Sequence, residues 1–414
     1  MPERTSNRWI IAAAGVILQI ALGAVYAWSV FRTPLTSAFH WTIPQVTLAF
    51  TIAIFTLGIA SFVGGLWMRT AGPRVVAMTA GVLYGLGVFL AAFSNYGLWV
   101  LYVTYGIIGG AGLGLGYIVP IAVLVKWFPE RRGFITGVAV AGFGAGALVT
   151  APVATRLIAQ VGVLTTFACL GIAYFILVVA AGWFMVNPPA GYRPAGWNPR
   201  AAEQAAGRDY TLGEALQTWQ WYGLWAVLFL NVSAGISIIS QAAPMAEEMT
   251  GVTAAEAAAM VGIISIANGS GRFLWAWLSD SIGRRWVFLA MFLLQAALFF
   301  LIPRVSGFGL FTTLAFIILL CYGGGFGTMP AFCADYFGSR DVGSIYGLML
   351  TAWGFGSALG PLLIANIRQS TGHYTQALYI IAGIMLASAA IPLVLHPPAA
   401  QRGGALTAQP RATR

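Results

Sequence analysis

Long apolar stretches, each of about 20 residues or more, recur along the chain and are separated by short polar connectors. A helix of that length crosses a hydrocarbon core of roughly 30 Å. The pattern therefore predicts an all-α membrane protein with twelve transmembrane helices. The predicted spans are residues 9–31, 44–68, 75–94, 97–125, 134–158, 163–186, 219–246, 254–279, 286–302, 308–334, 342–367 and 375–395.

One long polar segment, residues 187–217, divides the spans into two sets of six. Its prolines and charges are typical of a linker, with room for one short amphipathic helix. We expect an N-terminal six-helix bundle over residues 1–186, a cytoplasmic linker over 187–217, a C-terminal bundle over 218–398 and a disordered cytoplasmic tail over 399–414.

The two halves match each other at an offset of about 210 residues, which is the mark of a duplicated unit. Gly72 corresponds to Gly283, and Pro120 corresponds to Pro330. A run of glycines is repeated as well: Gly133, Gly137, Gly144 and Gly146 against Gly343, Gly347, Gly354 and Gly356. Paired six-helix repeats place a substrate site near the midplane between them, reached alternately from either side.

The charge distribution orients the predicted helices and excludes one class of partner. The chain is 59% hydrophobic and 8% charged, with a net charge of +10. Its basic residues lie in short connectors and form no basic face, so nucleic-acid binding is excluded. With the N-terminus inside, 16 of the 21 basic residues are cytoplasmic and 4 are external. The positive-inside rule thus predicts a multi-pass protein of the bacterial inner membrane with both termini cytoplasmic.

The three cysteines, Cys169, Cys321 and Cys333, lie in apolar spans and are predicted to be buried.

Three motifs carry a resemblance to a known family. Residues 280–285, Asp-Ser-Ile-Gly-Arg-Arg, resemble the cytoplasmic loop motif of the major facilitator superfamily, although Arg69 replaces the usual acidic residue in the first copy. The stretch Gly23–Phe31 and the stretch Trp127–Gly133 resemble the oxalate/formate antiporter family and its relatives, the monocarboxylate (lactate and pyruvate) transporters. The resemblance covers roughly residues 7–395 and implies the major facilitator fold.

Arg272 is the candidate centre of function. It lies eight residues before Asp280 and so about 12 Å inside span 8, near the midplane. A buried arginine in a membrane is costly unless it faces a partner, and its planar fork suits a carboxylate. A structural ion pair is the alternative, but the middle of every span lacks an Asp or Glu. We therefore expect the partner to be a substrate anion. The resemblance implies the same role, since monocarboxylate transporters anchor substrate through an arginine at this place.

Two neighbouring positions refine this hypothesis. Asn268 is four residues earlier on the same helical face and is expected to bond the guanidinium or a substrate hydroxyl, with a helix–helix hydrogen bond as the alternative. The resemblance implies an aspartate there in animal monocarboxylate transporters, so a proton route through this position is in doubt. The resemblance implies a second buried cation, a lysine, in span 11 of oxalate carriers, and Trp353 stands at that place here. One fixed cation then favours one carboxylate over a dianion.

Aromatic side chains in glycine-rich spans are the remaining candidates for the substrate-binding wall, because a ring covers an apolar body while a hydroxyl finds a polar partner. Packing or a place in the interfacial belt is the alternative for each of them. The candidates are Tyr26, Tyr117, Tyr322, Phe326 and Phe355.

Charged residues near the helix ends are candidates for gating or for a proton route. Ion pairs among the cytoplasmic ones are expected to close the inner gate, the alternative being a plain orientation signal. The candidates are Glu130, Arg131, Asp280, Arg284, Arg285, Asp335 and Glu256, the last near the outer end of span 8.

These features together predict a secondary active transporter of small monocarboxylates, with L-lactate moving together with a proton. An organic-anion exchanger of the oxalate/formate type is the main alternative, and a non-transporting membrane receptor ranks below it. An enzyme is not expected, because no acid, base or metal cluster lies in the spans. We expect no cofactor, a small anion, a proton and the lipid bilayer as partners, and a functional monomer.

Overall fold

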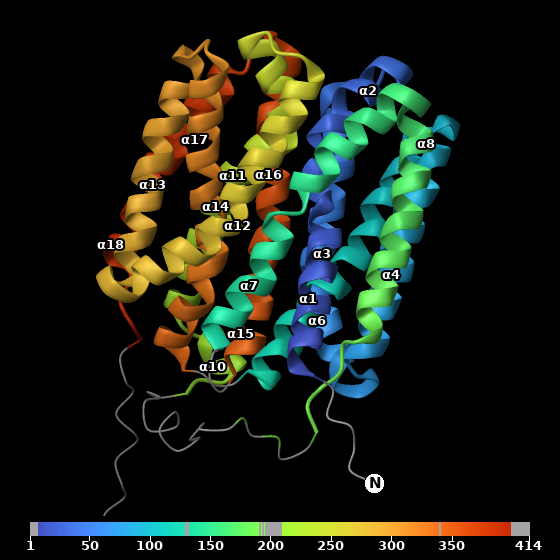
Figure 1. Ribbon diagram of the computed structural model, residues 1–414. Helices are drawn as coiled ribbons and strands as arrows, with labels where there is room; N and C mark the ends of the chain where they lie inside the picture. The colour runs from blue at the N-terminus through green and yellow to red at the C-terminus, as the bar shows by residue number, and fades with distance from the viewer. Residues whose placement is uncertain are drawn as a thin grey trace, which may run out of the picture.

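The computed structural model describes residues 7–128, 132–189, 192, 194, 209–338 and 341–398, and the structural statements below concern those residues. Their regular structure is helical (Figure 1). The N-terminal half contains α1 (Arg8–Gly23), η1 (Ala24–Ala27), α2 (Ser29–Phe39), α3 (Ile43–Ala71), α4 (Pro73–Leu90), η2 (Ala91–Tyr96), α5 (Leu98–Leu101), η3 (Tyr102–Gly109), α6 (Gly110–Trp127), α7 (Arg132–Gly144) and α8 (Ala147–Trp183).

The C-terminal half repeats this arrangement of long helices broken by short irregular turns. It contains α10 (Leu212–Leu216), α11 (Trp219–Thr250), α12 (Ala254–Ile282), α13 (Arg284–Leu301), η5 (Ile302–Arg304), α14 (Phe308–Phe337), α15 (Val342–Met349), α16 (Thr351–Thr371), α17 (Thr375–Ser388) and α18 (Ala390–Val394). The short helix α10 lies within the segment predicted as a linker.

The described helices account for twelve crossings. They form 11 stretches that are long and apolar enough to span a bilayer, and one of these, Gly137–Trp183, has 47 residues. That stretch contains two predicted spans and reverses at Gly162, whose φ of +80° is strained for any residue with a Cβ. The predicted twelve-helix fold is therefore confirmed.

Local signals at the helix ends show the internal duplication. α3 and α12 both begin with a capping box, formed by Thr42 with Gln45 and by Thr253 with Glu256. Both end at a glycine with positive φ, Gly72 at +80° and its counterpart 211 positions later at +92°. Glu256, a candidate for the proton route, thus bonds the first turn of α12.

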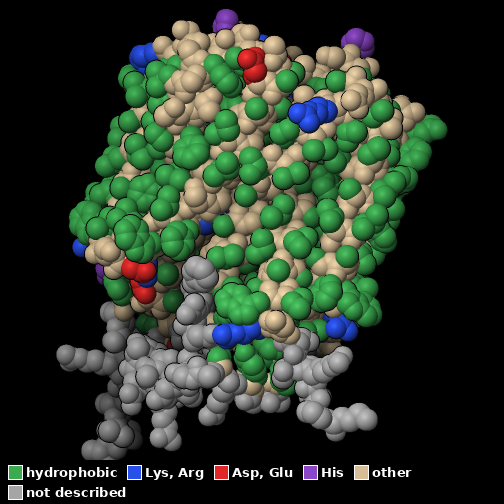
Figure 2. All heavy atoms as spheres, viewed as in Figure 1, with side chains coloured by type: hydrophobic (Ala, Val, Ile, Leu, Met, Phe, Trp, Pro, Cys, Tyr) green, Lys and Arg blue, Asp and Glu red, His purple; other side chains and the backbone are tan. Residues whose placement is uncertain are grey.

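The two ends of the molecule differ from the apolar region between them. The beginning of α1 and the short helix α10 lie at one end, which we call the termini end; we call the opposite end the distal end (Figure 1). On the face in Figure 2 most charged side chains gather near these ends, and apolar side chains cover the area between them. Cys321 and Cys333 are buried as predicted, but Cys169 is exposed. The prediction was wrong there because an apolar side chain can face lipid as well as the interior.

The two halves pack against each other through a few helix pairs. α16 packs along α3, α12 packs against α7 and α8, and α11 contacts α2. Close approach at Gly144, where a Cβ would meet the backbone of Gly269, brings α7 against the middle of α12. The contact surface between the halves therefore runs through the centre of the molecule, beside Arg272.

Candidate anion site at the centre of the bundle

Arg272 lies inside the protein rather than at its surface. It projects from α12 with only 1% of its surface exposed, and Asn268, one turn nearer the distal end, is equally buried. The guanidinium carbon of Arg272 is 4.8 Å from the centre of the Phe326 ring, a cation–π distance. The structure thus brings together three residues that the sequence proposed for one site.

The backbone around Arg272 is held by glycines of α14. A Cβ on Gly323 would overlap the carbonyl oxygen of Asn268, and a Cβ on Gly327 would overlap the carbonyl oxygen of Arg272. The two glycines are four residues apart, as are the residues they touch, so α12 and α14 approach in register. This packing fixes the height at which Arg272 enters the interior.

Six aromatic rings surround this position, and we call them the central cage. Three come from the N-terminal half and three from the C-terminal half: Tyr26, Tyr117, Phe143, Tyr322, Phe326 and Trp353. Their ring centres lie 4.7–6.0 Å from those of neighbouring members, mostly in edge-to-face geometry. The cage therefore closes the interior with contacts that belong to both halves.

Contacts between the halves within the cage are both polar and apolar. The hydroxyl oxygens of Tyr26 and Tyr322 are 2.9 Å apart and share a hydrogen bond. Trp353 packs at 5.2 Å on Tyr117 and at 5.6 Å on Phe143. Rocking of one half against the other must separate these pairs, so the cage is positioned to respond to motion of the halves.

Several polar atoms of the cage form no hydrogen bond. Among the described residues no carboxylate or carbonyl oxygen accepts a hydrogen bond from the buried Nε and Nη atoms of Arg272, and the hydroxyl of Tyr117, with those of Tyr26 and Tyr322, is the polar group near its charge. Asn268 Oδ1 and Trp353 Nε1 also have no partner. Among the described residues no Asp or Glu pairs with Arg272. Since buried donors are normally bonded, the N–H groups of Arg272 and Trp353 are suited to an incoming anion, whereas Asn268 Oδ1, an acceptor, is suited to a hydroxyl group of the same ligand.

Phe143 is the cage member that the sequence reasoning did not name. It lies directly before Gly144 in the run of glycines that is repeated in the second half of the chain. Gly23 and Gly146 each lie so close to the neighbouring helix that a Cβ would overlap its backbone, and at Gly23 the overlapped atom is the carbonyl oxygen of Phe143. The glycine run therefore does pack, and in doing so it brings the Phe143 ring into the cage.

Phe355 lies apart from the cage. Phe355 is 49% exposed, and its ring contacts Phe55 of α3 and Trp225 of α11.

A small, largely apolar cavity continues the site toward the distal end. Its walls are Tyr26, Ala147, Ile239, Ala242, Val261, Ile264, Ser265, Asn268 and Leu319.

The gating candidates of the termini end form contacts within one half. Arg284 pairs with Asp280 at 2.6 Å and with Asp335 at 3.2 Å, and all three belong to the C-terminal half. Arg285 lies over the ring of Trp286. Glu130 and Arg131 fall outside the described residues. The described ion pairs here therefore stabilise the C-terminal half and do not join the two halves in this conformation.

A second buried arginine, Arg32, was not among the sequence candidates. It is 5% exposed and its guanidinium donates to three side chains of the C-terminal half. The acceptors are Gln241 Oε1 at 2.8 Å, Tyr374 Oη at 2.8 Å and Glu248 Oε1 at 3.1 Å. Arg32 and Glu248 both lie just past the predicted ends of spans 1 and 7, at residues 31 and 246, so neither partner of the ion pair was expected inside a helix. The signal that could have found the pair is that the helices α2 and α11 continue past residues 31 and 246.

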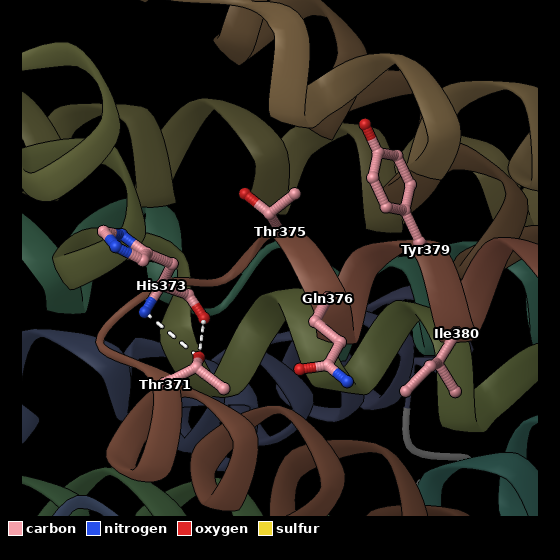
Figure 3. Close-up of a pocket in the computed structure, with 6 residues that line it drawn as sticks. All are labelled: Thr371, His373, Thr375, Gln376, Tyr379 and Ile380. Carbon is pink, nitrogen blue, oxygen red and sulfur yellow. Dashed lines mark hydrogen bonds between the residues drawn. The ribbon is translucent and has the colours of Figure 1, made fainter.

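A separate hollow of about 480 Å³ lies at the distal end, where α16 turns into α17 (Figure 3). Its lining residues are Thr371, His373, Thr375, Gln376, Tyr379 and Ile380. The Thr371 hydroxyl bonds the backbone of His373 at both the nitrogen and the oxygen. This hollow lies at the distal end, away from Arg272. The hydrogen bonds between Thr371 and His373 stabilise the turn that lines it.

Comparison with known proteins agrees with this architecture. The model of the Major Facilitator Superfamily matches residues 10–249 and 224–412. An uncharacterized MFS-type transporter of Escherichia coli K12, YhjX, is 31% identical over 85% of this chain and 86% of its own. The oxalate:formate antiporter of Oxalobacter formigenes is 26% identical over 94% and 93%, and monocarboxylate transporter 13 of rat is 25% identical over 91% and 86%.

A solved structure shows the same fold. It is a bacterial homologue of the human lysosomal transporter Spinster, in an inward-facing and occupied conformation, with a TM-score of 0.71 at 14% identity over 94% of this chain and 96% of that one. The matched relatives are transporters, and the chain has the apolar helices of a multi-pass membrane protein. The match over nearly its whole length makes this chain a member of the Major Facilitator Superfamily.

Proposed function

We propose that this protein carries small monocarboxylates across the membrane by alternating access, with L-lactate as the substrate and a proton as the coupled ion. The observation that carries the proposal is Arg272: a fixed cation at the centre, with no carboxylate or carbonyl acceptor among the described residues for its guanidinium nitrogens. A carboxylate supplies two acceptor oxygens in the plane that a guanidinium presents. Asn268 then bonds the substrate hydroxyl or carbonyl.

The charge balance of the central cage favours one carboxylate. Among the described residues Arg272 is the single cation at the cage, and Trp353, at the place where the family resemblance implies a lysine in oxalate carriers, is an uncharged ring buried against Phe326. A dianion would bring one carboxylate into this interior without a counter-charge, at a cost of several kcal/mol. Relatives named as a monocarboxylate transporter and as an oxalate:formate antiporter support an anionic substrate.

The orientation belongs to the same proposal. The count of basic residues supports a cytoplasmic termini end and an external distal end, in a bacterial inner membrane. A monomer suffices, because the central cage is assembled from the two halves of one chain.

Uptake of labelled L-lactate into proteoliposomes tests the proposal, with and without an inward proton gradient. We expect the gradient to accelerate uptake and to drive lactate above its external concentration. A protonophore control should remove the effect while leaving the vesicles tight. No saturable lactate uptake under either condition, and none with lactate loaded inside the vesicles, would contradict monocarboxylate transport altogether.

Exchange of organic anions without a proton is the second candidate, favoured by the oxalate:formate antiporter among the relatives. The same vesicles distinguish the two. Exchange predicts that lactate loaded inside accelerates entry of labelled lactate while the proton gradient has no effect. A receptor that does not transport predicts binding of lactate without uptake.

A further inference from the structure

A charged cluster joins the two halves at the distal end, far along the chain from Arg272. It consists of Arg32 on α2, Glu248 at the end of α11, and Arg368 on α16. Glu248 uses one oxygen for each arginine, at 3.1 Å to Arg32 and 2.6 Å to Arg368. One carboxylate therefore bridges an arginine of the N-terminal half and an arginine of the C-terminal half.

The two contacts of Glu248 differ in what happens when the halves separate. Glu248 and Arg368 belong to the same half, so their ion pair is unaffected by a rigid rotation of the halves. Arg32 belongs to the other half, and its bonds to Gln241, Tyr374 and Glu248 all cross between the halves. Opening of the distal end removes every one of these three bonds from Arg32.

The surroundings of Arg32 hold it in place for this contact. Tyr374 follows the turn between α16 and α17 that Thr371 braces through its hydroxyl (Figure 3). Burial raises the pKa of the Tyr374 phenol to about 12, against the lowering effect of Arg32, so the phenol stays protonated at neutral pH. Gln241 is fixed from its other side, because its amide donates to Thr47 of α3 at 3.0 Å.

Further contacts between the halves lie beside this cluster. Thr51 of α3 donates to the carbonyl of Ser357 on α16 at 3.0 Å, and Gln369 accepts from the backbone of Ile43 at 3.1 Å. These bonds are neutral, whereas those of Arg32 are charge-assisted and partly shielded from water, which makes them the strongest polar contacts of this group.

We propose that Arg32 and Glu248 form an ionic latch that holds the distal ends of the two halves together, with Arg368 keeping Glu248 in position. The latch sets the population of the distal-closed conformation. It acts on the conformational equilibrium, not on the anion at Arg272, so it is independent of which substrate the protein carries.

The latch can be tested by distances between spin labels in the substrate-free protein. Ser37→Cys on α2 and Ser370→Cys on α16 are exposed positions at the distal end, one in each half. A second pair, Thr70→Cys and Ser281→Cys, reports the termini end. Cys169 is replaced by Ala, since its thiol is exposed while Cys321 and Cys333 are buried.

Arg32→Gln and Glu248→Gln are each expected to lengthen the distal distance in a new population and to shorten the termini-end distance. A charged hydrogen bond contributes enough to shift the open-to-closed ratio by about tenfold or more. The double variant should shift no further than Arg32→Gln alone, because removal of Arg32 already breaks the contact that Glu248 makes with the other half. Arg32→Lys, which keeps the charge, should retain much of the closed population.

Arg304→Gln is the matched control, since this distal arginine contacts Phe300 and Tyr379 of its own half. A distal distance in Arg32→Gln and Glu248→Gln equal to that of the wild type and of the control would overturn the proposal. Additive shifts in the double variant would also overturn it. If Arg32→Gln fails to fold, Glu248→Gln and Arg32→Lys carry the same comparison.

Discussion

Two arginines are buried between the halves of this protein, and their surroundings are opposite. Arg32 has three side-chain acceptors from the other half, among them a carboxylate. Arg272 has an aromatic ring beneath it, and within the described part of the chain no carboxylate or carbonyl oxygen accepts from its nitrogens. The fold therefore satisfies one buried cation by itself and leaves the other to a partner from outside.

The contrast separates two uses of the same side chain. A cation that the protein neutralises fixes one conformation, since its bonds exist only when the halves are together. A cation that the protein leaves unsatisfied costs stability, which binding of an anion recovers. The distal arginine thus suits a latch and the central one suits a binding site.

The largest effect is expected at the central arginine in transport. Arg272→Lys keeps the positive charge but loses the planar fork, so one of two charged hydrogen bonds to the carboxylate is lost. Uptake of labelled lactate, as the ratio of maximal rate to half-saturation concentration, should fall about 10-fold to 100-fold. Uptake at the wild-type rate would contradict bidentate binding. Arg304→Lys provides the matched control.

Stability should change in opposite directions at the two arginines. Arg272→Met removes a buried charge that has no carboxylate partner. It should raise the free energy of unfolding of the ligand-free protein by about 1–4 kcal/mol, and with it the unfolding temperature. Arg32→Met removes the donor of Gln241 Oε1 and one of the two arginine donors of Glu248, and should lower the free energy of unfolding by about 1–3 kcal/mol. Thermal unfolding in detergent, followed by tryptophan fluorescence, measures both. The same sign for both variants would break the comparison.

Selectivity should follow the number of central cations. Trp353→Lys puts a second cation beside Phe326, the ring that the Arg272 guanidinium contacts. Inhibition of lactate uptake by oxalate should then strengthen by about tenfold relative to inhibition by a monocarboxylate, because the second carboxylate gains a counter-charge. Trp353→Phe, which changes ring size without charge, should leave the ratio unchanged. An unchanged ratio in the lysine variant would remove the charge argument for a monocarboxylate.

The smallest effect is expected at Tyr374. Tyr374→Phe removes one neutral acceptor from Arg32 while the ion pair with Glu248 stays, so the latch should weaken by about 0.5–1.5 kcal/mol. Because burial raises the pKa of this phenol to about 12, the wild-type latch should not change between pH 7 and pH 10 on its account. The distal spin-label distance measures the effect of Tyr374→Phe and that of pH. A shift in Tyr374→Phe as large as that in Arg32→Gln would show that the latch depends on Tyr374 and not on the Arg32–Glu248 ion pair.

Much of the fold could be predicted because the bilayer imposes it on the sequence. Apolar stretches, the repeat of Gly72 at Gly283 and the lone Arg272 are local features that survive without tertiary information. Arg32 could not be interpreted in this way. Its ion-pair partner is 216 residues away, and both lie where the span boundaries are least certain.

The sequence by itself determined a membrane-spanning helical duplication and predicted an arginine without a carboxylate partner inside it, because composition and spacing are fixed along one chain. Only the tertiary structure decided which rings surround Arg272, that Phe143 belongs with them and that Phe355 does not. It also decided that Arg32 is neutralised while Arg272 is not. The physical reason is that a buried charge is satisfied by geometry between helices, and residues that meet across two halves share no pattern along the chain.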